Sequence, residues 1–161
     1  MANQFTVNTY SAKDVTLIVG GYQVMGWENI SISRNATTFT PIRGIRGKHT
    51  RIPSADTSAT ISVSILQTSA SNDVFSAIHE ADQINGTGRL QVLLKDGSGK
   101  SVFSSVDAYI VGFPVATFSG GFEYRAWQIF CQSTQDFTVA GNGRPNTNIF
   151  DSVLGGISNL L

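Results

Sequence analysis

The chain has 161 residues, which is enough for one domain with a buried core. Its 11 basic and 11 acidic residues give a formal net charge of zero, which argues against a general surface for binding polyanions. Charged residues make up only 14% of the chain, below the roughly 25% usual in soluble domains, so its surface is either rich in Ser, Thr and Asn or covered by partners.

At the start of the chain, residues 1–4 contain neither a basic region nor an apolar run. We therefore expect no secretory signal, and a protein that stays in a cytoplasm until something releases it. Alternating polar and apolar residues then predict strands at residues 5–10, 15–19 and 22–27. Residues 20–21, both glycine, predict a two-residue turn between the last two of these strands.

A strand predicted at residues 29–33, with Ile30 and Ile32 on one face, leads into a segment of different character at residues 41–57. This segment has two prolines and two glycines, and its length predicts a long loop of the kind that is usually functional or mobile. Its basic residues are Arg43, Arg46, Lys48, His49 and Arg51. They could grip nucleic acid or meet an acidic patch on another protein, and we favour the protein contact because no aromatic residue is present to stack bases.

Residues 58–67 form the clearest predicted strand, because small hydroxyl side chains alternate there with apolar ones. The apolar face consists of Ala59, Ile61, Val63 and Ile65. The hydroxyl face consists of Ser58, Thr60, Ser62 and Ser64. That second face predicts a wettable surface with almost no charge.

One amphipathic helix is predicted at residues 72–83, with Ser71 as its N-cap and Asp73 placed where the helix dipole favours an acid. Its inward stripe is predicted to be Val74, Phe75, Ile78 and Ala81. Residues 85–88 end the helix.

Strands are then predicted at residues 89–95 and 101–111, joined by a tight turn at residues 96–99. The sequence at residues 97–101 resembles the end of a phosphate-binding loop, but a strand follows it where that motif needs a helix. Two more strands are predicted at residues 122–132 and 137–140.

The end of the chain, residues 141–161, changes character, and we expect a domain at residues 1–140 followed by this extension. A Gly/Asn/Pro linker comes first, and apolar residues at helical spacing then predict a short helix weakened by two adjacent glycines. Such a helix either docks on its own domain or contacts a neighbouring subunit. The residues predicted for that intersubunit contact are Phe150, Val153, Leu154 and Ile157.

Residues with catalytic or metal-binding chemistry are few in this chain. Cys131 is the single cysteine, and His49 and His79 are not spaced as metal ligands usually are. A Ser-His-acid triad lacks its usual nucleophile elbow. We therefore expect no enzymatic activity, no cofactor and no metal, and no segment resembles a membrane span.

Several segments resemble bacteriophage tail tube proteins, and together they extend from about residue 5 to residue 140. These segments are YSAKDV (10–15), GYQVMGW (21–27), SILQTSASNDVFSA (64–77), LLKDGSG (93–99) and YRAWQI (124–129). The LQTSxSN run before the helix is the most characteristic of them. The extension after residue 141 departs from the family pattern.

The resemblance implies a mainly β subunit, sandwich-like or barrel-like, with one flanking α-helix. Six copies would form a ring, their strands would close an inner β-barrel, and stacked rings would conduct DNA into the host during ejection. The tube would belong to the virion tail, with sheath, baseplate and tail terminator proteins as its partners, assembly in the host bacterial cytoplasm and no membrane insertion.

Under this resemblance the hydroxyl face of residues 58–64 would line the lumen, and the basic loop would contact the adjacent ring. A contractile tail is the leading expectation. A tube protein of a tailocin or a type VI secretion system is an alternative. From a different class, a monomeric binding module that holds a ligand in its basic loop is another.

Overall fold

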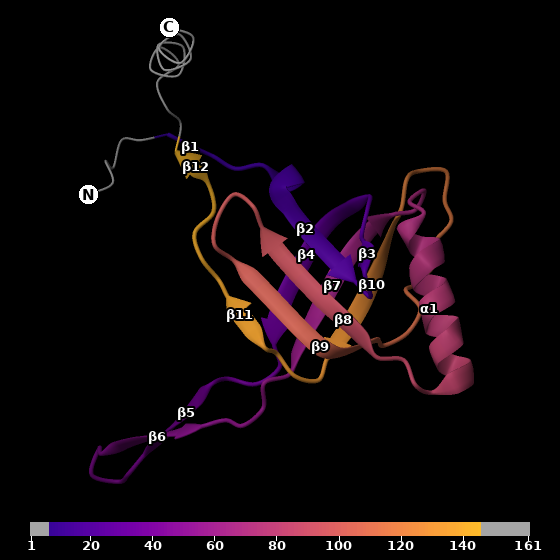
Figure 1. Cartoon of the computed structure of the whole chain (residues 1–161). Helices are drawn as coiled ribbons and strands as arrows, with labels where there is room; N and C mark the ends of the chain where they lie inside the picture. Colours follow the sequence, from indigo (N-terminus) through magenta and orange to yellow (C-terminus); the bar gives the residue numbers. More distant parts are fainter. Residues whose placement is uncertain (1–6, 146–161) are drawn as a thin grey trace, which may run out of the picture.

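The structure is a computed structural model that describes residues 7–145 (Figure 1). Two helices lie in this range, the 3-10 helix η1 (Ala12–Asp14) and the α-helix α1 (Ser71–Asn85). The strands are β1 (Asn8–Thr9), β2 (Val15–Val19), β3 (Tyr22–Gln23), β4 (Trp27–Arg34), β5 (Phe39–Arg43), β6 (His49–Pro53), β7 (Ala59–Leu66), β8 (Leu90–Asp96), β9 (Val102–Ile110), β10 (Tyr124–Cys131), β11 (Asp136–Thr138) and β12 (Arg144–Pro145). The prediction of a mainly β protein with one flanking α-helix is confirmed.

One antiparallel sheet contains most of these strands, in the order β3-β2-β8-β9-β10-β7-β4, with β11 paired to β9. The sheet bends so that β2, β8 and β9 lie over β4, β7 and β10 (Figure 1). It does not close, because β3 and β4 stand at its two edges without a strand between them in the described chain. The result is an open sandwich, with α1 along one side.

The core fills the space between the two halves of this bent sheet. On β7 every second side chain is buried, and Ala59, Ile61, Val63 and Ile65 have no exposed surface, as their alternation predicted. The facing half contributes side chains from β2, β8 and β9. Those buried residues are Leu17, Val19, Val92, Phe103, Ala108 and Ile110.

Helix α1 covers the side of the sandwich and places Phe75 edge-on against Trp127, with ring centroids 5.5 Å apart. The predicted inward stripe is partly wrong, because Ala81 is exposed and His79 is buried in its place. The predicted N-cap is also wrong, since Ser71 lies inside the first turn. Its hydroxyl is used instead to bond the backbone of Met25.

That same contact shortens a predicted strand. The strand expected at residues 22–27 ends at Gln23, because Met25 donates its N–H to Oγ of Ser71 and accepts from that hydroxyl at its carbonyl, both over 2.9 Å. Gly26 then adopts a φ of +71°, which turns the chain into β4. A Cβ at Gly26 would lie 2.7 Å from Cβ of Ser69, so this turn requires glycine.

The segment predicted as a long irregular loop, residues 41–57, is largely a β-hairpin. Strands β5 and β6 pair from Phe39 with Pro53 to Arg43 with His49, and the hairpin projects away from the sandwich (Figure 1). The two prolines do not prevent this pairing, because a two-stranded ribbon tolerates proline wherever its missing N–H would point to solvent. The loop prediction is therefore wrong at residues 41–43 and 49–53, which are strands.

The described part of the predicted extension stays attached to the domain. Asn142 forms an antiparallel bridge with Gly99, and Gly143 donates its N–H to the carbonyl of Ser98. Strand β12 then pairs with β1. The boundary at residue 140 stays a prediction, and Phe150, Val153, Leu154 and Ile157 lie outside the described residues. Between residues 7 and 145, no helix combines the length and the hydropathy needed to cross a membrane.

Candidate assembly surfaces

The paired positions on the outer face of the β4, β7 and β10 layer carry no charged side chain. Residues that pair across strands share a face, and Ser62 on β7 pairs with Ser31 on β4 and with Gln128 on β10. The same register defines the rest of this uncharged face. It consists of Asn29, Ser31, Ser33, Thr60, Ser62, Ser64, Ala126, Gln128 and Phe130.

Three of the four hydroxyl residues predicted to line a lumen lie on this uncharged face, and the fourth, Ser58, is buried. Ser58 is buried just before β7, and its hydroxyl accepts a hydrogen bond from the amide of Asn35 over 3.0 Å. Thr60 donates its own hydroxyl to Oδ1 of Asn35 over 2.8 Å. Ser58 is thus a structural residue, while Ser62 and Ser64 remain partly exposed on the face.

The uncharged face ends at an open strand edge. Strand β4 pairs with β7 on one side, and no strand covers its other side among residues 7–145. The opposite edge of the sheet is β3, which has only two residues. An uncovered edge of eight residues is a site where another strand can add, so the sheet can be extended by a second chain.

The β5–β6 hairpin brings together all five basic residues predicted for a contact. Cross-strand pairs place Arg43, His49 and Arg51 on one face, where the Arg51 guanidinium lies 4.3 Å from the centre of the Phe39 ring. The other face carries Ile42 and Ile52 with two threonines. The hairpin therefore has a basic face and an apolar face.

The turn of the hairpin carries the other two bases. Gly44 donates its N–H to the carbonyl of Lys48 over 2.7 Å, and Gly47 has a φ of +88°. Between them, Ile45 is fully exposed at 104% of its reference area, and Arg46 is exposed beside it. No acidic residue lies between Phe39 and Pro53.

At the base of the hairpin, Asp56 forms a hydrogen bond that stabilises the chain between β6 and β7. Its carboxylate accepts a hydrogen bond from the N–H of Ser58 over 2.8 Å. Hydrogen bonds from Ser58 lower the pKa of Asp56 below its ordinary value, with a smaller contribution from the charge of Arg34. The carboxylate is therefore ionised at neutral pH, where it fixes the entry into β7.

A second apolar surface lies on the connection between β9 and β10, residues 111–123. Phe113 packs against the ring of His79, but Val115 and Phe118 are 83% and 84% exposed. Beside them is a groove of about 300 Å³, lined by this connection, the start of α1 and β10. Sequence reasoning missed this surface, although apolar residues clustered between Pro114 and the glycines at 120–121 were a visible signal.

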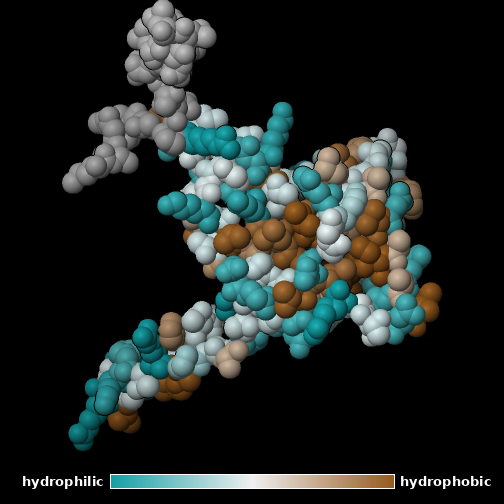
Figure 2. Space-filling view, in the orientation of Figure 1, coloured by the Kyte–Doolittle hydropathy of each residue, from teal (hydrophilic) through white to brown (hydrophobic). Residues whose placement is uncertain are grey.

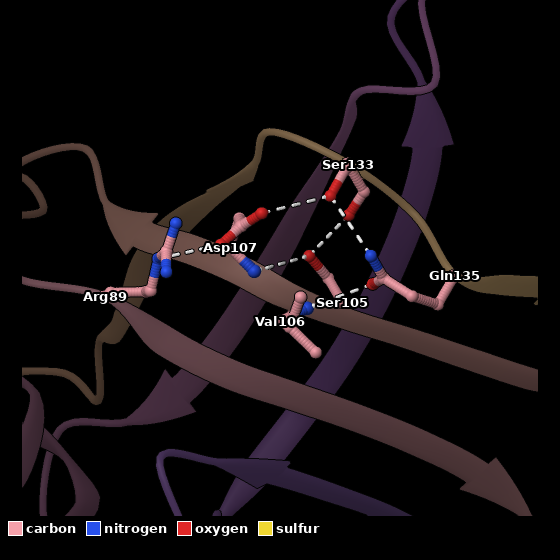
Figure 3. Close-up of polar contacts among 6 residues, drawn as sticks. All are labelled: Arg89, Ser105, Val106, Asp107, Ser133 and Gln135. Atoms are coloured by element: carbon pink, nitrogen blue, oxygen red, sulfur yellow. Dashed lines mark hydrogen bonds and ion pairs between the residues drawn. The ribbon is translucent and has the colours of Figure 1, made fainter.

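A polar cluster around the bulge of β9 is structural (Figure 3). Strand β9 bulges, because Val92 pairs with Ser105 while Leu90 pairs with Ala108. The β10–β11 turn closes over this bulge, where Ser105 donates to the carbonyl of Ser133 over 2.6 Å.

Two further contacts complete this cluster. Val106 donates its N–H to Oε1 of Gln135 over 3.0 Å, and Arg89 forms an ion pair with Asp107 over 2.8 Å (Figure 3). The polar groups of the cluster are engaged with one another, so it positions the turn. In residues 7–145, no group of three or more His, Cys, Asp or Glu side chains is arranged to hold a metal ion.

Comparison with known proteins gives one sequence relative and several structural ones, and no protein-family model matches the chain. The chain is 32% identical over 157 residues to the structural protein ORF10 of Pseudomonas phage KPP10, covering 91% of this chain and 90% of the relative. A chain in the cryo-EM structure of the anti-feeding prophage cap (AFP tube terminating cap) has a TM-score of 0.55 at 13% identity, covering 85% of this chain and 97% of its own.

A chain in the tail of an empty gene transfer agent (GTA) particle, refined with C6 symmetry, is equally similar in structure. Its TM-score is 0.55 at 17% identity, and the match covers 86% of this chain and 100% of that one. At these identities the likeness to both solved structures shows a shared fold.

Proposed function

The chain belongs to the family of phage structural proteins that includes ORF10 of Pseudomonas phage KPP10, and from this premise we propose that it is a subunit of a phage tail tube. Six copies would form each ring, and stacked rings would conduct DNA into the host. The fold supports this proposal, because it is shared with a chain of a tube-terminating cap and with a chain of a GTA tail that has C6 symmetry.

The uncharged face beside an open edge is the observation that carries the proposal. If β4 of each copy adds to the sheet of the next, the ring closes into a barrel and no edge remains exposed. The uncharged face would then line the lumen. Lysine or arginine there would bind phosphates and retain DNA, whereas small hydroxyls such as Ser62 and Ser64 are wetted without holding the DNA.

The β5–β6 hairpin supports stacking of the rings. It projects from one end of the molecule and exposes both of its faces, and an isolated two-stranded hairpin is marginally stable in water. Contact with the adjacent ring would cover it, with Arg43, Arg46, Lys48 and Arg51 as the charged contacts. Such a head-to-tail interface does not close, so it grows a filament.

The apolar residues of the C-terminal extension belong to the same proposal. Phe150, Val153, Leu154 and Ile157 would contact a neighbouring subunit and add to the ring interface. Sheath, baseplate and terminator proteins of a contractile tail would be the further partners, with assembly in the host bacterial cytoplasm.

A ring that terminates a tube is the second candidate, favoured by the likeness to the AFP cap chain. A terminator closes one end, so it forms rings that do not elongate. A tube subunit has a stacking surface at both ends and polymerises.

Electron microscopy of the purified protein over a range of concentrations and salt tests the proposal. We expect rings at low concentration and tubes at high concentration. Rings of fixed size that never elongate would favour the terminator, and a protein that stays monomeric under every condition would refute both.

A further inference from the structure

We propose that the connection between β9 and β10, residues 111–123, receives the β5–β6 hairpin of a second copy in the next ring. This inference rests on the proposed function, because it names the surface that the hairpin contacts. The β9–β10 connection has no role in the tube proposal above, and it is among the most exposed apolar segments of residues 7–145.

The hairpin and this connection lie at opposite ends of the same three strands. At one end, Arg34 pairs with Ala59 and Ala59 with Cys131, and the hairpin joins β4 to β7 there. At the other end, Leu66 pairs with Tyr124, where the β9–β10 connection enters β10. Figure 1 shows the same relationship, with the hairpin at lower left and the orange connection at upper right.

Opposite ends are the arrangement that head-to-tail stacking requires. A heterologous interface joins two different surfaces, one from each end of the molecule, and repeats without closing. The hairpin of one copy would therefore reach the 111–123 end of another copy without changing the orientation of either chain.

The two surfaces also match in chemistry. The apolar face and turn of the hairpin expose Ile42, Ile45 and Ile52, and the receiving surface exposes Val115 and Phe118. Figure 2 shows apolar and polar residues side by side on the hairpin. Apolar patches of this kind on both ends mark contact sites, since burying them together removes both from water.

Charge gives the contact its direction. The hairpin is basic and has no acid, whereas Glu123 precedes β10 and Asp73 is exposed on the first turn of α1 beside the groove. Arg125 also lies at this end, but its guanidinium is 5.0 Å from the centre of the Phe118 ring and it donates to the carbonyl of Thr117. Arg125 keeps its positive charge, so the three residues together carry one net negative charge, and Arg46 at the hairpin turn would approach the two acids.

Disulfide trapping between two singly substituted chains tests the contact. An affinity-tagged Ile45→Cys chain is mixed with untagged Phe118→Cys chain, tubes are grown, and the sample is oxidised mildly. The expected product is a disulfide-linked pair of one tagged and one untagged chain. The native thiol of Cys131 is buried, so it does not compete.

The matched comparison uses Leu93→Cys in place of Phe118→Cys. Leu93 is also exposed and apolar, but it lies on the outer face of β8. If tubes form and the tagged chain links to Leu93→Cys as well as to Phe118→Cys, or to neither, the receiving surface is wrong while the tube function stands. If the unsubstituted protein forms neither rings nor tubes, the proposed function itself fails.

A second variant keeps the inference testable if the cysteine chains do not assemble. Phe118→Ser should raise the protein concentration needed for tube growth at least about tenfold, as expected for a central interface residue. Ile84→Ser removes an equally exposed side chain from the end of α1 and should leave that concentration unchanged. Tube growth by Phe118→Ser at the unsubstituted protein's concentration would overturn the inference.

Discussion

Trp127 donates its indole N–H to Oδ1 of Asn72 over 3.0 Å, which ties the buried centre of β10 to the first turn of α1. The amide nitrogen of Asn72 in turn donates to the carbonyls of Leu66 and Ser69, over 2.8 and 3.1 Å. One side chain thus joins the start of the helix to the centre of β10 and to the end of β7.

Replacing Asn72 with alanine should lower the free energy of unfolding by about 1–3 kcal/mol, because the N–H of Trp127 is then buried without an acceptor. Urea denaturation followed by tryptophan fluorescence measures this change. Gln83→Ala removes an exposed polar side chain from the same helix and serves as the control. Equal stability of the two variants would contradict the role given to Asn72.

The basic residues of the hairpin should be required for tube growth. Arg46→Glu combined with Arg51→Glu cancels the net positive charge of the hairpin, so we expect monomers or single rings in place of tubes, with an unchanged melting temperature. Lys95→Glu combined with Lys100→Glu makes the same change in net charge on exposed positions of the β8–β9 hairpin. Tubes from the first variant, or their loss in both, would argue against a specific contact.

Local patterns were enough to predict the strands that have one buried face. Alternation identified β7 with both of its faces, and Gly20 and Gly21 located the turn after β2. The order of strands could not be predicted in this way, because β4 pairs with β7 and β2 with β8 over long stretches of chain. Those pairings depend on packing between distant segments, which periodicity does not report.

For the assembly surfaces too, individual residues could be predicted from the sequence, but their arrangement in space could not. The hydroxyl residues of β7 were identified, but Ser31 and Gln128 join them only through the register of three strands. The bases were identified as a group, while their hairpin was not, because the length of the segment and its prolines and glycines indicated a loop. The predicted inward face of the helix was wrong at Ala81, which is exposed, because the buried side chain in the second half of the helix is His79.

A lysine on the uncharged face should convert a lumen that releases DNA into one that retains it. In Ser62→Lys tubes every copy adds one cation to the face, so a labelled duplex should bind at about 50 mM salt and dissociate near 1 M. Val139→Lys places the same charge on a residue that is 83% exposed away from this face. If the two variants retain the same amount of DNA, the uncharged face does not line the lumen.

The thiol of Cys131 should react slowly while the protein is folded. Burial raises the pKa of Cys131 to about 11 from 9.0, although a hydrogen bond with Ser105 acts in the opposite direction. Near pH 8 the thiolate fraction then falls by about 100-fold, and limited access slows the reaction further. Labelling with a thiol reagent, with and without denaturant, measures the difference, and equal rates would contradict the burial.

The same pKa shift has a consequence for stability at high pH. The folded state holds the proton of Cys131 more tightly than the unfolded state does. The contribution of this difference to the free energy of unfolding is fully present below about pH 9 and is lost as the pH rises toward 11. Cys131→Ala, which removes the titrating group, should show a weaker loss of stability over this range. A loss of the same size in both proteins would assign it to other groups.

The C-terminal extension should matter for assembly more than for folding. Phe150→Ser combined with Leu154→Ser removes two of the apolar residues proposed to contact a neighbouring subunit. We expect ring formation, measured by analytical ultracentrifugation, to require a higher protein concentration, while the melting temperature of the monomer stays the same. A lower melting temperature with normal rings would mean instead that the extension packs on its own domain. Asn146→Ser combined with Asn148→Ser, which alters only polar residues just before the apolar ones, is the control and should change neither measurement.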